Sequence, residues 1–223
     1  MSRLTERIDG LDLSGLEMLA AVLEKAATQL DPDELGEDDI LGLLDRIDAP
    51  ATTNAWPIDY DRVRAWRQHE LYLYQKDPSY FEQRKAYYAS GVDGCVDWIN
   101  HWMDTHDPRN AGMRDADGKR LPVTLPLVLF KRQEDLVRFM FACIDAEVDG
   151  LVEKTRDMGA TWVAIAVSVW MWVFWDGSTF GFGSATAVKL DRSNDAGSIF
   201  YKLRDVCRNL PTPFRPKTLK PSR

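Results

Sequence analysis

An apolar stretch in the last third of the chain most constrains the fold. It runs for about fourteen residues, from Trp162 to Trp175, and contains no charged side chain. A helix needs about twenty apolar residues to cross a bilayer, so this stretch is too short and suits a helix buried in a protein core. We expect Trp170, Trp172 and Trp175 to pack in that core rather than to stack on single-stranded nucleic acid.

Charge is distributed unevenly along the 223 residues. Residues 1–50 hold four Lys/Arg against thirteen Asp/Glu, a net charge of -9, whereas residues 51–223 hold twenty-four against twenty-two, a net charge of +2. From Tyr201 onward, seven basic residues face Asp205 alone. This basic end fits either a solvated tail or a segment that contacts phosphate, and charge by itself does not separate the two.

Cysteine usage indicates a reducing compartment. Cys95, Cys143 and Cys207 are odd in number and lack CxxC spacing, so we expect reduced, mostly buried thiols in a cytosolic protein. The N-terminus has no basic stretch followed by an apolar core, so no secretory signal is predicted.

The first half of the chain has helical periodicity. Residues 1–49 predict two acidic amphipathic helices, and the Pro- and Thr-containing stretch 49–54 predicts a linker. Residues 50–120 predict a second, helical region. One of its helices carries the face Val63, Trp66, Glu70 and Tyr74, and Asp77-Pro78 predicts a capped start for the next.

Asp104, His106 and Asp107 could form a metal cluster, but Pro108 favours a capped helix end, and the polar loop to Arg120 is expected to be exposed. From residue 121 on, predicted helices alternate with predicted strands. The pattern predicts a helix over 133–144, a strand over 151–153, a helix over 161–175, a strand over 179–184 and a helix over 199–210. This order is typical of an α/β protein.

The loop between the first of these strands and the apolar helix carries the candidate chemistry. A phosphate-binding loop points consecutive backbone N–H groups and the positive end of a helix at phosphate, and it has the spacing G-x-x-x-x-G-K-[ST]. Here Gly159 and Thr161 match the last Gly and the Ser/Thr, but Ala160 replaces the lysine and Lys154 replaces the first Gly. Lys154 or Arg156 could supply the missing cation, but from the residues alone an ordinary strand-to-helix turn fits better.

Four segments together resemble a known family. LVEKTRDMGATW is similar to the deviant phosphate-binding loop, with its basic residue at the front, of tailed-bacteriophage terminase large subunits, the motors that package viral DNA. LPLVLFKRQEDLVRF resembles their adenine-side segment, and FGFGSATAVKLDRSNDAGSIFYKLRDVCRNLP resembles the second strand and the lead into the next helix. YYASGVDGCVDWINHWMDTHDPRN is similar to their helical lead-in. The resemblance covers roughly residues 75–216 and leaves residues 1–49 outside.

The resemblance implies an α/β fold, a partial P-loop ATPase sheet of the RecA-like class, preceded by an all-helical N-terminal region. It divides the chain into an acidic extension (1–49), a helical lead-in (50–120) and the first half of the ATPase domain (121–223). It also implies ATP and Mg²⁺ as cofactors. Gln133 would read the adenine edge, with Phe130 or Arg132 near the base, and Thr161 would hold Mg²⁺. The loop would bind the nucleotide through the residues Lys154, Thr155, Arg156, Asp157, Met158, Gly159, Ala160 and Thr161.

Hydrolysis in this class needs a second motif, in which an Asp holds Mg²⁺ and a Glu orients the attacking water. Nothing after Ser184 has an apolar strand ending in Asp-Glu, so no catalytic residue is predicted within this chain. We expect a truncated form, a split gene product or a fragment that binds nucleotide yet hydrolyses little.

For the intact protein the resemblance implies ATP-driven movement of double-stranded viral DNA into a procapsid and cleavage by a C-terminal nuclease. The expected partners are the terminase small subunit and the portal protein, with homo-oligomers on the portal, in the host bacterial cytoplasm and without a membrane. Two alternatives remain, a helicase-like P-loop ATPase and a non-catalytic phage assembly or adaptor protein.

Overall fold

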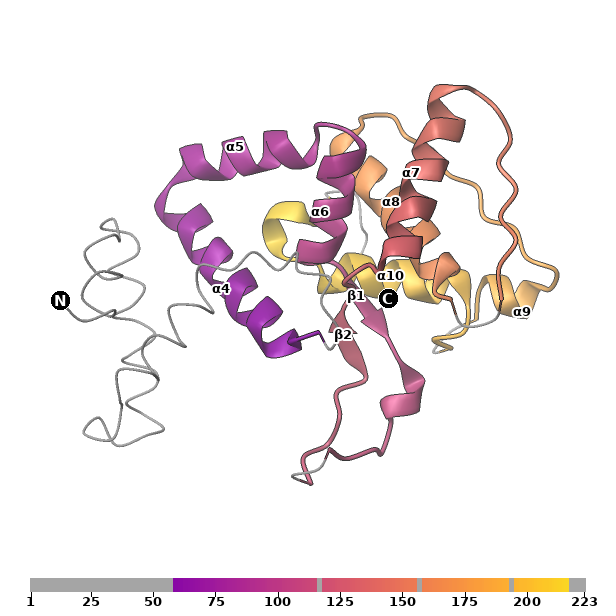
Figure 1. Cartoon of the computed structure of the whole chain (residues 1–223), viewed down its shortest axis with the longest axis horizontal. Coiled ribbons are helices and arrows are strands. Elements are labelled where there is room, and N and C mark those ends of the chain that lie inside the picture. The colour runs from indigo at the N-terminus through magenta and orange to yellow at the C-terminus, as the bar shows by residue number, and fades with distance from the viewer. Residues whose placement is uncertain (1–57, 116–117, 156–157, 193–194, 217–223) are drawn as a thin grey trace. The chain divides into compact units, whose positions relative to one another are not determined.

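The computed structural model describes residues 58–115, 118–155, 158–192 and 195–216 (Figure 1). The acidic helices predicted for residues 1–49 and the linker predicted at 49–54 lie outside these ranges. The chain divides into two compact units, Met1–Thr53 with Asp61–Gln83 and Asn54–Tyr60 with Arg84–Arg223, and each is described by itself. The boundaries predicted after residues 49 and 120 stay predictions.

The first unit contains α4 (Tyr60–Lys76) and the start of α5 (Pro78–Tyr88). The side chains that α4 buries are those of the predicted face, Val63, Trp66, Glu70 and Tyr74, so that prediction is confirmed. The capped start is confirmed as well. The Asp77 carboxylate accepts hydrogen bonds from the backbone N–H groups of Ser79 (2.9 Å) and Tyr80 (3.2 Å), and Pro78 opens the helix.

The second unit is built around α8 (Ala160–Phe174), which confirms the helix predicted from the apolar stretch. α8 packs against α6 (Val92–Trp102), α7 (Lys131–Asp145) and α10 (Ile199–Asn209), and it is buried over Ile165–Met171. Figure 1 shows α7 and α8 running in the same direction, with α10 crossing them and the short α9 (Ala187–Leu190) leading into it. The buried stretch of α8 therefore forms the centre of the unit.

Aromatic side chains from distant parts of the chain complete this core. Phe214, in the short 3-10 helix η3 (Thr212–Phe214), is almost fully buried, and its ring lies 5.2 Å from that of Trp102 and 5.8 Å from that of Tyr88. The indole N–H of Trp170 donates to the carbonyl of Tyr88 (2.9 Å). Up to residue 216, the described part of the basic end is folded and buries Val206, Cys207, Leu210 and Phe214, whereas Arg208 and Arg215 are exposed.

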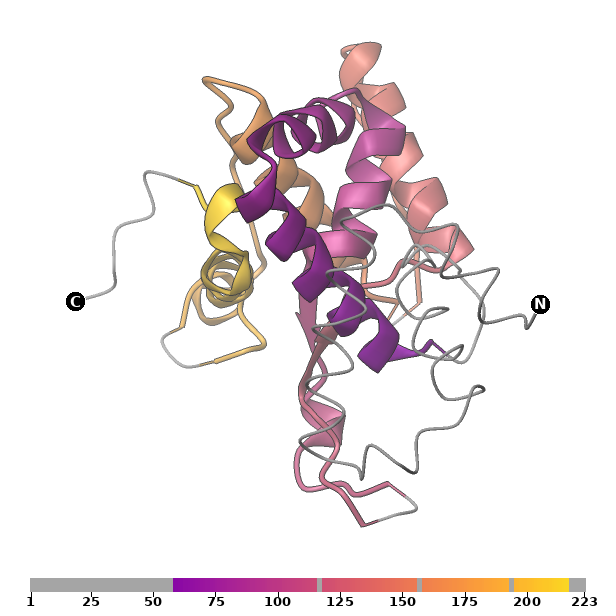
Figure 2. The ribbon, with the colours of Figure 1, turned by 90° about the vertical axis from the view of Figure 1, so that its left-hand side faces the viewer.

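A two-stranded antiparallel sheet, absent from the sequence prediction, joins the helices. β1 (Asp104–His106) pairs with β2 (Thr124–Pro126), Thr105 opposite Leu125. Figures 1 and 2 show these strands and the connection between them, which includes the 3-10 helix η2 (Pro108–Asn110), projecting from the helices as an arm. The exposed loop predicted up to Arg120 belongs to this arm.

The strands predicted at 151–153 and 179–184 are wrong, because both segments are irregular. A strand needs a neighbour for its backbone N–H and C=O groups, and alternation or apolarity alone does not supply one. Leu151 is 93% exposed, and Phe182 is held by ring packing on Phe200 of α10 (6.1 Å) rather than by a strand partner. The described residues contain one two-stranded sheet, and the partial P-loop sheet stays a prediction.

Candidate functional site

The predicted phosphate-binding loop leads directly into the buried helix. Lys154 and Thr155 are exposed, Gly159 is the N-cap of α8 with φ 74°, and Thr161 lies in the first helical turn. Arg156 and Asp157 lie outside the described residues. The loop therefore has the helix that the motif requires after it, whereas the segment before it is irregular.

Gln133 ties this loop to α7. Its side-chain oxygen accepts from the backbone N–H of Phe130 (3.3 Å), and its amide nitrogen donates to the carbonyl of Met158 (3.2 Å). The side chain is 8% exposed, and a Cβ placed on Gly159 would stand 2.5 Å from its nitrogen. Gln133, predicted to read an adenine edge, thus has both ends of its amide bonded within the chain.

An open cleft of about 760 Å³ lies beside the loop. Of the predicted site residues, Gln133, Lys154, Gly159, Ala160 and Thr161 line it, and so does Phe130. Thr155, Met158 and Arg132 do not line it. The structure therefore brings together most of the described residues that the sequence grouped, although Gln133 precedes Lys154 by twenty-one residues.

Three helices begin in the wall of this cleft. Phe130 precedes α7, Gly159 precedes α8, and the turn 195–197 precedes α10. The N-cap residues Gly159 and Ser198 make no side-chain cap hydrogen bond; the Ser198 hydroxyl donates instead to the carbonyl of Asp195 (3.0 Å). Helix N-termini present backbone N–H groups and partial positive charge, which are able to stabilise an anion.

Two basic side chains line the cleft without an ion pair in the described part of the chain, Lys154 and Lys202. Lys202 is half-buried, and its ammonium group lies 5.4 Å from the ring centre of Trp162 in the first turn of α8. Burial lowers the pKa of Lys202, and the charge of Asp195 opposes that shift. The sequence assigned no particular role to Lys202, because nothing local places α10 beside the loop.

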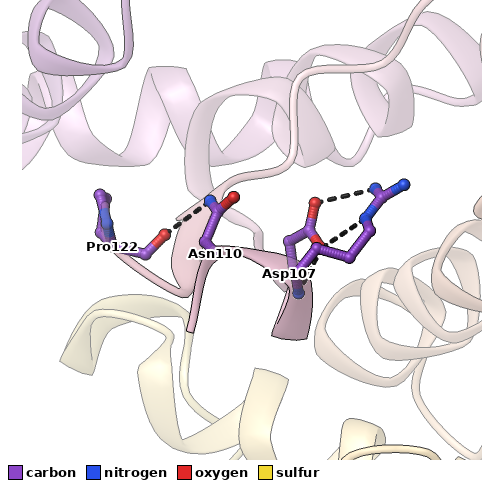
Figure 3. Close-up of polar contacts among 4 residues, drawn as sticks. Asp107, Asn110 and Pro122 are labelled. Atoms are coloured by element: carbon purple, nitrogen blue, oxygen red, sulfur yellow. Dashed lines mark hydrogen bonds and ion pairs between the residues drawn. The ribbon is translucent and has the colours of Figure 1, made fainter. Parts of the chain in front are cut away.

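A third basic side chain of the cleft, Arg109, is neutralised by its neighbour. Asp107 accepts from the Nε and Nη2 atoms of Arg109, both at 2.8 Å, and from the Arg109 backbone N–H at 3.0 Å (Figure 3). These bonds lower the pKa of Asp107. Asp107 thus caps the start of η2, and the capped helix end predicted at this position is wrong, because α6 already ends at Trp102.

The carboxylates lining the cleft are Asp107 and Asp195. Asp107 is occupied by Arg109, and Asp195 accepts from the backbone N–H of Gly197 (2.8 Å). Neither follows an apolar strand in the way that the acidic motif of a P-loop ATPase does. Neither lining carboxylate is therefore placed as the acidic motif requires, and the imidazole of His106 lines the cleft beside them.

Comparisons with protein-family models, with curated proteins and with solved structures found no match for this chain. Among the described residues, none of the helices has the length and apolarity to cross a membrane.

Proposed function

We propose that the cleft binds a nucleoside triphosphate with Mg²⁺, ATP being the expected nucleotide. The observation that carries this proposal is the meeting of Gln133, Lys154, Gly159 and Thr161 in one cleft into which three helix N-termini open. Polyphosphate suits such a site, since backbone N–H groups and an ammonium group together compensate its charge. In this proposal Lys154, with Arg156 as the alternative, is the loop cation, and the Thr161 hydroxyl holds Mg²⁺.

The resemblance over residues 75–216 extends this proposal to the whole molecule. The chain would be the ATP-binding portion of a terminase large subunit, whose intact form moves double-stranded viral DNA into a procapsid and cuts it. The terminase small subunit and the portal protein would be its partners, in the host cytoplasm. We propose nucleotide binding for this chain, and no hydrolysis by it alone.

Calorimetric titration with a non-hydrolysable ATP analogue, with and without Mg²⁺, tests the site. Wild type should bind in a Mg²⁺-dependent manner, and Lys154→Ala should weaken binding by about tenfold or more, because a charge-assisted hydrogen bond to phosphate is lost. Lys189→Ala, an exposed lysine of α9 outside the cleft, is the matched control and should bind as wild type does. Circular dichroism and a melting curve first establish that each variant is folded.

A second candidate, a non-catalytic assembly or adaptor protein, is favoured by one feature. Exposed apolar side chains gather on the second half of α7 and the segment after it: Phe139, Ile144, Val148, Leu151 and Val152. Exposed apolar patches commonly mark protein-binding surfaces. The same titration separates the two functions, because an adaptor predicts a folded wild type that binds no nucleotide. A helicase-like ATPase would share the binding result.

A further inference from the structure

The α10 side of the cleft contains a basic group with unusual surroundings. Lys202 lies about one turn into α10 and some forty residues beyond the predicted loop, yet it lines the same cleft as Lys154. Lysine side chains usually extend their ammonium groups into water, where the charge is well solvated. Here the chain is half-buried, and the ammonium group lies over Trp162.

Trp162 links this lysine to the predicted phosphate-binding turn. It follows Thr161 directly and lies in the first turn of α8. The N-cap residue of α8 is Gly159, so no N-cap side chain bonds the first backbone N–H groups of the helix. An ammonium group held 5.4 Å from that ring is therefore positioned beside the turn. The ring attracts a cation but cannot accept the hydrogen bonds of an ammonium group as an anionic oxygen can.

Apart from Lys154, the other charged side chains of the cleft form their bonds elsewhere, so the Lys202 ammonium group can bind an anion. Arg109 is committed to Asp107 by two bonds of 2.8 Å. Asp195 faces Lys202 electrostatically but forms no ion pair with it within 4.0 Å among the described residues; the carboxylate accepts from Gly197 N–H and lies 3.9 Å from Arg192. In the described chain, no carboxylate lies within ion-pair distance of Lys154 or Lys202. The positive charges of these two lining side chains are therefore not compensated by an ion pair.

We propose that Lys202 is a second phosphate-binding residue, which holds the polyphosphate of the nucleotide from the α10 side while Lys154 and the first turn of α8 hold it from the other. This inference rests on the proposed function, because it concerns the same ligand. On binding, the Lys202 ammonium group donates to a phosphate oxygen and keeps its aliphatic stem against Trp162. The ligand thereby joins α10 to α8.

The test compares Lys202→Gln, Lys202→Arg and Lys189→Gln by titration with the non-hydrolysable ATP analogue and Mg²⁺. Lys202→Gln should weaken binding by about tenfold, because one charge-assisted hydrogen bond to phosphate is lost. Lys202→Arg, which keeps the charge, should bind within about threefold of wild type, and Lys189→Gln should equal it. Melting temperatures within about 2 °C of wild type establish that the fold is kept.

The outcomes separate this inference from the proposed function. If wild type binds, Lys154→Ala weakens binding and Lys202→Gln does not, then Lys202 is no ligand and the nucleotide site stands without it. The same conclusion follows if Lys202→Arg binds as poorly as Lys202→Gln, because only the packing of the lysine on Trp162 would then matter. If folded wild type shows no Mg²⁺-dependent binding, both proposals fail together.

Discussion

Two structural constraints restrict position 159 to glycine. Its φ of 74° lies in the left-handed region that side chains disfavour, and the Gln133 amide occupies the space where a Cβ would stand, 2.5 Å away. The first constraint sets the direction in which the loop enters α8. The second keeps Gln133 bonded to the carbonyl of Met158. A residue other than glycine would disturb the start of α8 and its attachment to α7 at once.

Gly159→Ala should lower the free energy of unfolding by about 1–3 kcal/mol, from the left-handed backbone and the displaced Gln133 side chain. Urea denaturation measures this change. Gly181→Ala is the control, since a Cβ at Gly181 meets nothing within 4 Å, and its effect should stay within about 0.5 kcal/mol. Equal losses in the two variants would show that the close contact with Gln133 has no energetic role.

The place of Asp77-Pro78 at the start of α5 and of Gly159 before α8 was predictable from local chemistry. The place of Lys202 in the cleft was not. Lys202 reaches the cleft because α10 packs against α8, a tertiary contact that leaves no mark in the local sequence.

The arm consists of β1, β2 and the connection between them, and polar side-chain bonds hold this connection together. Asp107 binds Arg109, and the side-chain amide of Asn110 donates to the carbonyl of Pro122 (2.9 Å), which joins the two sides of the arm (Figure 3). Exposed side chains dominate the connection between the strands, so apolar burial contributes little there. Charge and hydrogen bonding should therefore govern its order.

Asp107→Asn removes the charge and retains a capping side chain. Because Arg109 lowers the folded pKa of Asp107 below its ordinary value of 3.8, the ionised carboxylate stabilises the fold above that value. This contribution is lost as the pH falls through the lower, folded pKa. At pH 7 the variant should lose less than about 1 kcal/mol, since solvent screens an exposed pair. The difference from wild type should shrink as the pH falls below 3.8.

Denaturation curves at a series of pH values between 7 and 3 measure this effect. Asp149→Asn, at an exposed carboxylate after α7, serves as the control. A difference between Asp107→Asn and wild type that persists unchanged at pH 3 would exclude the ion pair as its origin.

Among the secondary-structure elements, the helices were predictable from the sequence, whereas the strands were not. A buried helical face repeats every three or four residues, so Val63, Trp66, Glu70 and Tyr74 were visible in advance. β1 and β2 are three residues each, too short for alternation to show, and their pairing depends on segments about twenty residues apart. The segment Leu151-Val152-Glu153 was predicted to be a strand, yet the described chain supplies no partner for it.

The core of the second unit depends on the end of the described chain. Besides Tyr88 and Trp102, the Phe214 ring lies 6.1 Å from that of Trp98 and 6.2 Å from that of Phe174. These neighbours come from α5, α6 and α8. A single side chain in a three-residue helix thus contacts the aromatic core on several sides.

Phe214→Ala should destabilise the second unit by about 3–5 kcal/mol, because a large buried ring is replaced by a cavity. Thermal melting followed by far-UV circular dichroism measures the loss. Phe139→Ala, at a phenylalanine that is 41% exposed, should cost less than about 1.5 kcal/mol. The packing described for Phe214 is contradicted if its removal costs no more than that of Phe139.

Three stretches that line the cleft lie far apart along the chain, around residues 130–133, 154–162 and 195–202, and the residues 105–109 and 125–128 of the β1–β2 region line it as well. An occupant bound to all three acts as a reversible cross-link, much as a disulfide does between distant segments. Opening any one wall then requires release of the ligand. Local unfolding of α7, α8 and α10 would therefore be more tightly coupled in the filled protein than in the empty one.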